Sequence, residues 1–294
     1  MKKLLTAKLS LILLLSLFGS KANAWQDDGG SRDSQCCESS CYECGCNPLY
    51  CGAWDLQVQG GVNPILWRQR GYVSTVACSA PTGGPVFQLF QIPKFRSIFR
   101  IPWIVGGQVG YAWSDNTRLY VEFNYSQARA KGTPSALLVE GTLLPAGSSF
   151  NFLNTSKYKI FDAYVGARYY WDRWCDRVSF FFGGKVGLTH HKKVASDFQA
   201  VVAPAAAVSI LTAQEFFRSN TVVSGGANVG FDVCFCGNWS FVVTGEIVAS
   251  CGPRSVEPFA IPTNTSGFTG TNLFIGNIQT ELRFPVTAAI RYSF

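Results

Sequence analysis

The sequence of 294 residues predicts an all-β fold, a transmembrane antiparallel up-and-down β-barrel of eight strands. Three observations lead to this fold class: apolar and polar residues alternate along eight segments, the links between segments are alternately short and long, and the composition is unusual. Charged residues make up 15%, below the quarter that is usual in soluble domains, whereas Phe (23), Tyr (11), Trp (8) and Gly (29) are abundant. Strands of this composition suit a surface that faces lipid.

Residues 1–24 are predicted to be a secretory signal peptide. They begin with Lys2 and Lys3, continue with an apolar stretch, and end with small residues at Ala22 and Ala24. Residues 25–51 follow as a polar, cysteine-rich segment, expected in the periplasm, and residues 52–294 as the barrel. No later stretch has eighteen consecutive apolar residues, so no transmembrane helix is expected.

Each expected strand carries apolar residues at every second position. In 118–125, for example, Leu119, Val121 and Phe123 alternate with Glu122 and Asn124. A period of two places one set of side chains on each face of a strand. The segments that show this alternation are 54–63, 103–113, 118–125, 161–171, 178–189, 224–235, 239–250 and 280–294.

The links between these segments predict which end of the barrel is which. Residues 114–116, 172–177 and 236–238 form short turns, while the other links have some twenty or more residues. Short turns at one end and long loops at the other are typical of barrels in the outer membrane. The sequence therefore predicts a protein of the cell outer membrane, in contact with outer-membrane lipid.

The charged residues of the segments fall in the polar sets, so nearly every strand brings charge to one common side. A soluble barrel would have to bury these groups in an apolar pocket, whereas in a membrane barrel they face the lumen and pair there. Pairing is expected, for example, among Glu122, Arg168, Lys185 and Glu246. The expected lumen charges are Asp55, Arg118, Glu122, Asp162, Arg168, Lys185, Asp232, Glu246, Glu281, Arg283 and Arg291.

The signal peptide, the eight strands and the final strand ending in "RYSF" resemble the small eight-stranded bacterial outer-membrane barrels of the OmpA and OmpW kind. The resemblance covers residues 52–294 and rests on architecture. In that family an alternating C-terminal strand closing on Phe is the signal read by the barrel-assembly machinery. The resemblance therefore implies this role for Tyr292 and Phe294, with the assembly machinery as a partner. The chain departs from OmpA in lacking a peptidoglycan-binding domain and in its many cysteines.

The eleven cysteines all follow residue 24, which fits an oxidising compartment, and their odd number leaves at least one unpaired within the chain. One interpretation is a set of intramolecular disulfides that tie residues 25–51 to the base of the barrel. The other is disulfide bonding to neighbouring proteins of the envelope. The candidates are Cys36, Cys37, Cys41, Cys44, Cys46, Cys51, Cys78, Cys175, Cys236 and Cys251.

The stretch "CYECGCNPLYCGAWD" also resembles the cysteine-rich major outer-membrane porins of chlamydial type, whose envelopes are held by disulfide networks. That resemblance implies bonds to neighbours. A zinc site on Cys41, Cys44, Cys46 and Cys51 is a third interpretation, which the spacing and the oxidising compartment disfavour. No metal or cofactor is expected.

The function that the sequence favours is a structural outer-membrane protein with at most narrow pore activity, because eight strands leave a lumen just filled by side chains. The alternative is a surface adhesin or ligand-binding barrel that acts through its apolar loops at 133–153, 196–217 and 257–277. An outer-membrane lipid-modifying enzyme is less favoured, because the only histidines, His190 and His191, have no serine two residues away. The net charge of +7 is scattered, so nucleic-acid binding is not expected.

Overall fold

The structure is a computed structural model of the whole chain. Residues 1–50 lie outside the part that it describes, as do the two sequence-predicted segments within them, the signal peptide and most of the cysteine-rich segment. The described residues are 51–69, 73–79, 85–91, 95–131, 135–138, 149–174, 178–202, 207–236, 238–253, 260–265, 268–273 and 278–294.

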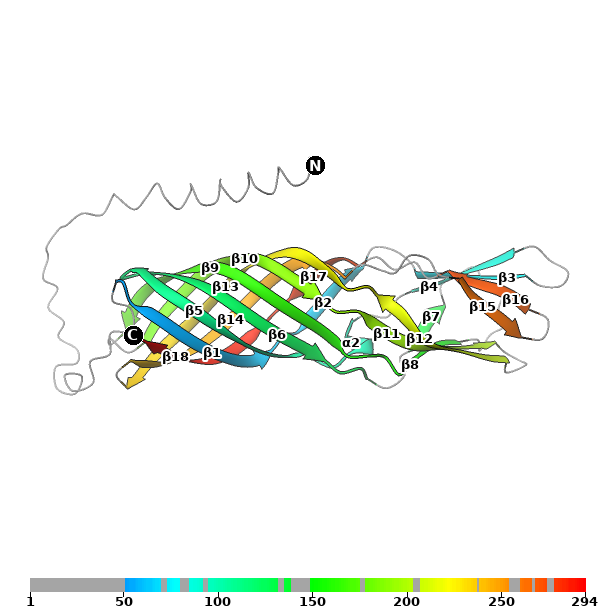
Figure 1. Cartoon of the computed structure of the whole chain (residues 1–294), viewed down its shortest axis with the longest axis horizontal. Helices are drawn as coiled ribbons and strands as arrows, with labels where there is room; N and C mark the ends of the chain where they lie inside the picture. Colours follow the sequence, from blue (N-terminus) through cyan, green and yellow to red (C-terminus); the bar gives the residue numbers. More distant parts are fainter. Residues whose placement is uncertain are drawn as a thin grey trace, which may run out of the picture. The chain divides into compact units, whose positions relative to one another are not determined.

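Eight antiparallel strands close into a barrel, which confirms the predicted fold class (Figure 1). Each strand pairs with its sequence neighbour, and the first strand pairs with the last. Around the ring the strands are β1 (Trp54–Val62) with its continuation β2 (Ile65–Gln69), β5 (Trp103–Ser114), β6 (Thr117–Ala128), β9 (Tyr158–Trp174), β10 (Val178–His191), β13 (Asn220–Cys236), β14 (Trp239–Cys251), and β17 (Ile278–Arg283) continued by β18 (Val286–Ser293).

The first and last strands are interrupted by prolines but keep one register. Val62 pairs with Val286, and Ile65 on the far side of Pro64 pairs with Arg283. The backbone N–H of Phe284 donates to the carbonyl of Pro64 at 2.9 Å, so bonding continues across the break. Proline has no N–H to donate, which explains why the ladder is interrupted there. The two halves of each interrupted strand therefore form one continuous strand of the barrel.

The long loops form hairpins beyond the end of the barrel that lies opposite the C-terminus (Figure 1). Their strands are β3 (Val73–Ser79), β4 (Pro85–Gln91), β7 (Ser135–Leu138), β8 (Ser149–Leu153), β11 (Val194–Val202), β12 (Ala207–Phe217), β15 (Ala260–Thr265) and β16 (Phe268–Leu273). They form a separate eight-stranded sheet, so they add no strand to the barrel ring. A short helix, α2 (Phe95–Ile98), precedes β5.

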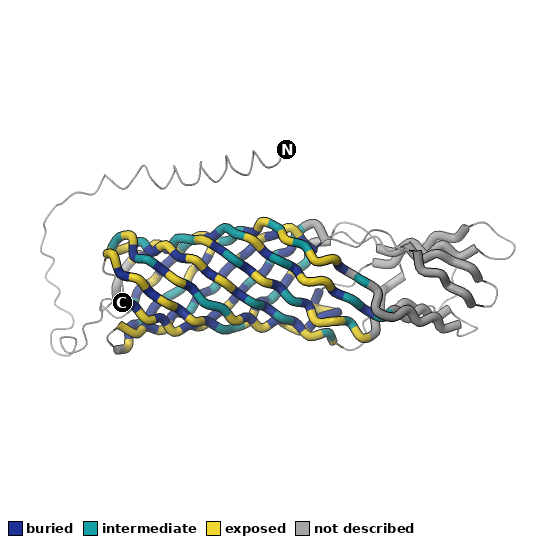
Figure 2. The backbone as a smooth tube through the Cα atoms, viewed as in Figure 1, coloured by how far each residue is buried: buried dark blue, intermediate teal, exposed yellow. Residues whose placement is uncertain are grey.

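Burial alternates along every barrel strand, as the bands of Figure 2 show. Outward side chains are apolar and exposed, among them Val58 (63%), Phe123 (62%) and Val229 (61%). The largest fully buried side chains include the arginines Arg118, Arg168, Arg283 and Arg291. This distribution is the reverse of that in a water-soluble protein, in which Arg is almost never fully buried. The apolar exterior and polar interior make this an outer-membrane barrel.

No helix among the described residues is long and apolar enough to cross a membrane.

Aromatic side chains cluster on the outer surface at both ends of the barrel. At the end with short turns, Trp54 lies 5.1 Å from Tyr111 and Trp239 lies 4.8 Å from Tyr292, measured between ring centroids. At the other end, Tyr125 lies 5.3 Å from Trp103 and 4.9 Å from Phe161. Two such girdles mark the two membrane interfaces.

The interior also holds aromatic rings, which the alternation of polar residues does not predict. Tyr120, Tyr164, Tyr170 and Phe181 are all at most 4% exposed and point inward. Glycines on neighbouring strands make room for them: a Cβ at Gly166 would lie 2.5 Å from the Tyr120 ring, and one at Gly230 would lie 2.5 Å from that of Phe181. The inward glycines of the alternating segments are thus the surface on which these rings pack.

Candidate functional site

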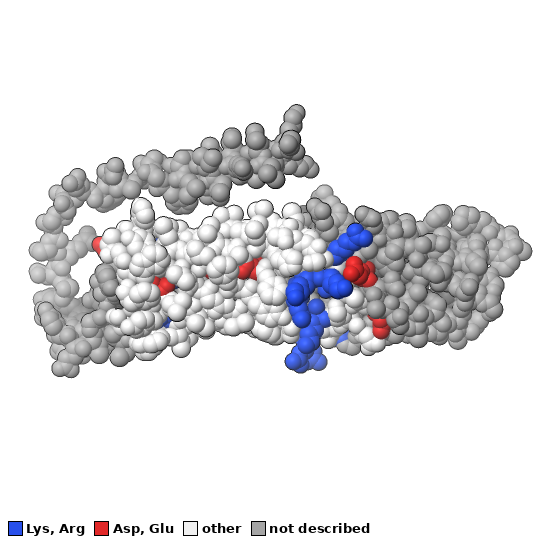
Figure 3. Space-filling view, in the orientation of Figure 1, with Lys and Arg blue, Asp and Glu red and all other residues white. Residues whose placement is uncertain are grey.

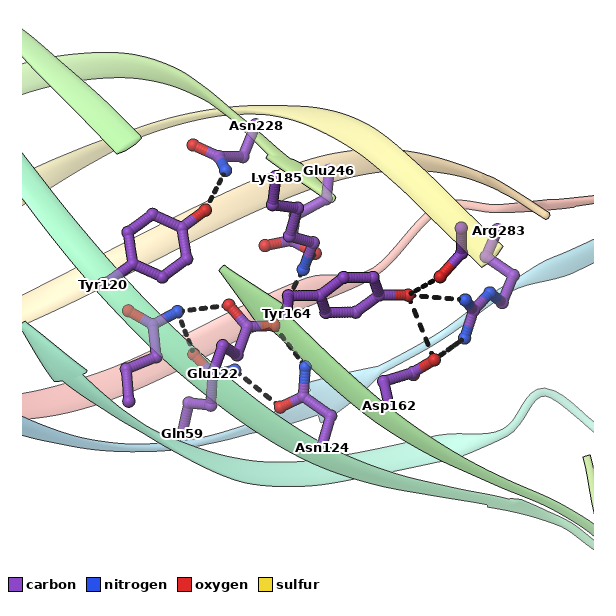
Figure 4. Close-up of polar contacts among 12 residues, drawn as sticks. Gln59, Tyr120, Glu122, Asn124, Asp162, Tyr164, Lys185, Asn228, Glu246 and Arg283 are labelled. Carbon is purple, nitrogen blue, oxygen red and sulfur yellow. Dashed lines mark hydrogen bonds and ion pairs between the residues drawn. The ribbon is translucent and has the colours of Figure 1, made fainter. Parts of the chain in front are cut away.

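The barrel lumen is the candidate site, and the structure places all the sequence-predicted lumen charges in it. Each of them is at most 8% exposed. They form layers along the barrel, joined by neutral polar side chains (Figure 4).

The layer toward the hairpins centres on Arg283 of β17. Its Nη1 donates to both oxygens of Asp162 on β9, at 2.8 and 2.9 Å. Its Nη2 donates to the hydroxyls of Tyr164 and Thr189, each at 2.8 Å. Ser224 on β13 completes the network through Thr189 at 2.7 Å. Charge-assisted bonds of this kind tie together strands on opposite sides of the lumen.

The middle layer centres on Lys185 of β10. Its ammonium lies 2.7 Å from Glu122 on β6 and 2.5 Å from Glu246 on β14. Gln108 donates to the other oxygen of Glu122 at 2.5 Å, and Asn124 also donates to this carboxylate. One lysine therefore bridges two carboxylates from strands that are not its neighbours in the ring.

The layer nearest the short turns contains two arginine–carboxylate pairs. Arg118 on β6 pairs with Asp55 on β1 through two nitrogens, and its Nε donates to Oδ2 of Asp55 at 2.6 Å. Arg291 on β18 pairs with Asp232 on β13 and donates to the hydroxyl of Tyr170 at 3.0 Å. Arginine suits such positions because its planar group can bind a carboxylate through two nitrogens.

Arg168 was expected to pair with a carboxylate, and the structure gives it another environment. Its guanidinium carbon lies 4.8 Å from the ring centre of Tyr120 and 4.6 Å from that of Phe181. Its three nitrogens make no hydrogen bond to another described residue. The buried charge is thus held against two aromatic faces, a cation–π arrangement. The alternation of polar and apolar residues does not reveal this arrangement, because inward aromatic residues such as Tyr120 fall outside the polar sets.

A cluster of aromatic rings lies at the end of the lumen toward the hairpins. Trp67 of β2 lies 4.8 Å from Phe95, 5.8 Å from Tyr158 and 5.4 Å from Phe217. Below them, Glu281 accepts hydrogen bonds from Tyr158 at 2.5 Å and from Trp67 at 2.9 Å. This end of the lumen therefore holds rings of which two, Tyr158 and Trp67, are hydrogen-bonded to a lumen carboxylate.

His190 has a serine partner that sequence spacing does not reveal. Ser219, on the segment leading into β13, lies 3.1 Å from Nε2 of His190, and Thr221 lies 2.9 Å from Nδ1. The pair arises because β10 and β13 are neighbours. In a hydrolase triad the second nitrogen faces a carboxylate that orients the imidazole, whereas here it faces a hydroxyl. His191 points inward and contacts the hydroxyl of Tyr158 at 2.9 Å.

Of the candidate disulfide cysteines, Cys51 and Cys251 have described side chains, and both are exposed free thiols. Cys51 lies at the short-turn end, with its sulfur 3.5 Å from the carbonyl of Trp113. Cys78 and Cys236 lie in strands whose side chains are not described there. The remaining candidates, Cys36, Cys37, Cys41, Cys44, Cys46 and Cys175, lie outside the described residues.

The predicted assembly residues lie where the ring closes. Phe294 exchanges two backbone hydrogen bonds with Trp54, at 2.8 and 3.0 Å. The rings of Tyr292 and Phe294 face outward, 37% and 60% exposed, and stack with centroids 6.3 Å apart. Both rings are therefore accessible on the outer surface of the barrel.

No protein-family model matches the chain, and no curated protein sequence matches it. Among solved structures, it is similar to Neisserial surface protein A (TM-score 0.36, 12% identity, 83% of this chain and 99% of that chain). It is also similar to the outer membrane protein OprG from Pseudomonas aeruginosa (0.37, 11%, 83% and 98%) and the outer membrane protease OmpT from Escherichia coli (0.37, 8%, 82% and 97%). Similarities this low carry no information on ligand or activity.

Proposed function

We propose that the protein is a structural component of the outer membrane whose lumen is closed to steady flow of solutes. The observation that carries the proposal is the set of charged layers that span the lumen, in which Lys185 and Arg283 join opposite strands. Water or an ion that crosses the barrel would have to separate pairs that are almost fully buried. The aromatic rings around Trp67 add a second obstacle at the mouth.

Planar-bilayer recordings of the folded protein should therefore show small, infrequent openings. The double variant Asp162→Ser/Arg283→Ser removes the Arg283–Asp162 ion pair and shortens both side chains, so openings should become larger and more frequent. A charge-keeping variant, Arg283→Lys, is the matched control and should stay close to the parent. Large, steady conductance of the unmodified protein would contradict the proposal.

A role in surface contact is the second candidate, supported by the hairpins. The long loops pair into one sheet instead of remaining separate coils. Deleting β15 and β16 and joining the remaining ends with a short glycine-serine linker leaves the barrel strands intact. If the hairpins are an adhesive surface, cells that carry this variant lose attachment to host surfaces at unchanged protein level. Unchanged attachment would contradict this role.

Disulfide bonding to the envelope is proposed from the placement of Cys51. Its exposed thiol lies where the cysteine-rich segment joins the barrel, at the short-turn rim. Electrophoresis without reductant should show high-molecular-weight species that vanish on reduction, and deletion of residues 25–51 should abolish them. The deleted protein should still shift its band on heating, as a folded barrel does. A monomer without reductant, with one free thiol at most, would establish intramolecular pairing instead.

Recognition by the barrel-assembly machinery is proposed for Tyr292 and Phe294. Their outward rings remain accessible at the strand that closes the ring. Phe294→Ala should reduce the amount of barrel in the outer membrane of cells while leaving refolding in detergent unchanged. Equal loss in both settings would indicate a purely structural role.

A further inference from the structure

Basic side chains gather at the hairpin end of the barrel, just beyond the membrane-facing surface. We call six of them the outer-rim basic belt: Arg100, Arg129, Lys131, Lys157, Lys159 and Lys192. Lys159 is half-buried and the other five are exposed. Figure 3 shows Lys and Arg concentrated at this end, while the rest of the visible described surface is nearly free of charge.

Backbone pairing places the cations of the belt next to one another. The N–H of Arg100 donates to the carbonyl of Arg129 at 2.9 Å, and that of Lys192 donates to the carbonyl of Lys159 at 3.0 Å. Lys159 in turn pairs with Gln127, two residues before Arg129. The belt therefore runs continuously across the ends of β5, β6, β9 and β10.

The belt residues form no ion pair with another described residue, although acidic side chains lie at the same end of the barrel (Figure 3). The exposed ion pair at this rim joins Lys193 to Glu215 at 3.5 Å, and none of the ion pairs found involves a belt residue. The lumen cations Lys185 and Arg283, by contrast, each face carboxylates. Neighbouring like charges repel one another, so an anion bound between them would be stabilising.

The belt lies at the level of lipid headgroups. The ammonium of Lys192 is 5.3 Å from the ring centre of Phe161, which belongs to the aromatic girdle with Tyr125 and Trp103. Such girdles sit at the membrane interface, so cations one step beyond them meet the headgroup phosphates. At the opposite rim, Asp115 is exposed and carries a negative charge. The basic belt thus lies at the rim next to the hairpins.

We propose that the outer-rim basic belt binds the phosphate groups of an anionic glycolipid in the outer leaflet. Long loops mark this end as the cell exterior. The belt follows the convex circumference of the barrel, and the ammonium of Lys192 lies over the lipid-facing ring of Phe161. A membrane-embedded anion can approach several of them at once from the side. The inference uses the outer-membrane location alone and is independent of pore or adhesin activity.

The test uses the folded full-length protein in detergent, titrated with diphosphorylated lipid A and followed by native mass spectrometry. The variant Arg129→Gln/Lys157→Gln/Lys192→Gln should bind about 100-fold more weakly, since each basic residue near such a surface contributes about a factor of five. The charge-keeping variant Arg129→Lys/Lys157→Arg/Lys192→Arg should match the parent. A band shift on heating verifies folding of every variant.

Two further binding measurements show whether the bound anion is a lipid phosphate, a free phosphate or a soluble polyanion. Dephosphorylated lipid A with the same acyl chains should bind the unmodified protein as weakly as the phosphorylated lipid binds the glutamine variant. Inorganic phosphate and a soluble sulfated oligosaccharide should compete poorly. Equal binding of both lipids, or an unweakened glutamine variant, would overturn the proposal. Strong competition by the oligosaccharide would assign the belt to a soluble polyanion, and strong competition by phosphate to the free ion.

Discussion

Replacing Lys185 by methionine is expected to lower the free energy of unfolding by about 3–5 kcal/mol. The ammonium of Lys185 is the cation between Glu122 and Glu246, and all three side chains are at most 4% exposed. Without it, two buried carboxylates face each other with no cation between them. Urea titration of the folded protein in lipid vesicles, followed by tryptophan fluorescence, measures the change.

The matched control removes the charges together. In Glu122→Gln/Lys185→Met/Glu246→Gln the facing carboxylates are removed together with the lysine, so part of the lost stability should return. The return should be incomplete, because the buried Arg168 then loses two negative charges that stabilise it. Gln108 and Asn124 can still hydrogen-bond to an amide at position 122. A loss below about 1 kcal/mol for Lys185→Met alone would show that the layer is hydrated and that its pairs contribute little.

Replacing Val229 by arginine is expected to cost about 2–4 kcal/mol, because it puts a charge into lipid near the middle of the membrane. Val229 is 61% exposed on the outer face of β13, midway along the strand. Val223→Arg is the control on the same strand and face. Val223 is 63% exposed but lies near the outer end, where the cost should be about 0–1 kcal/mol.

Equal costs at positions 229 and 223 would contradict the proposed membrane boundaries. Asn228→Arg, which would place the arginine in the lumen, is not a suitable low-cost control, because position 228 has no room for a longer side chain. Asn228 is 1% exposed, and its amide donates to the hydroxyl of Tyr120 at 2.8 Å.

The alternation of residues was enough to predict the barrel and the face of each strand, because a period of two is imposed by the extended backbone. It placed Glu122 and Lys185 on the same side of the sheet. It also led to the expectation that Lys185 pairs with Glu122 or Glu246, but alternation alone does not determine that one lysine contacts both, because contacts across a lumen depend on strand tilt and stagger. Arg168 shows a second limit, since its partners are two rings rather than a carboxylate.

The sequence does not predict that the long loops form paired strands, and the reason is a different one. Strands of a membrane barrel repeat a strict polar and apolar order because lipid lies on one side. The segments at 196–217 and 257–277 face no such uniform solvent and show no strict alternation. Their pairing is set by contacts between loops that are distant in sequence, as with β3 and β16.

The pairing of β1 with β18 closes the ring and therefore limits how the barrel can form. The two strands are over two hundred residues apart in the sequence, and each has a free edge until the other arrives. In lipid an open edge leaves unpaired N–H and C=O groups that no water can satisfy. Contacts between such distant segments also form slowly, because a long loop must close first. The barrel should therefore enter the membrane late, when both edges can join in one step, and loss of β18 should block insertion altogether.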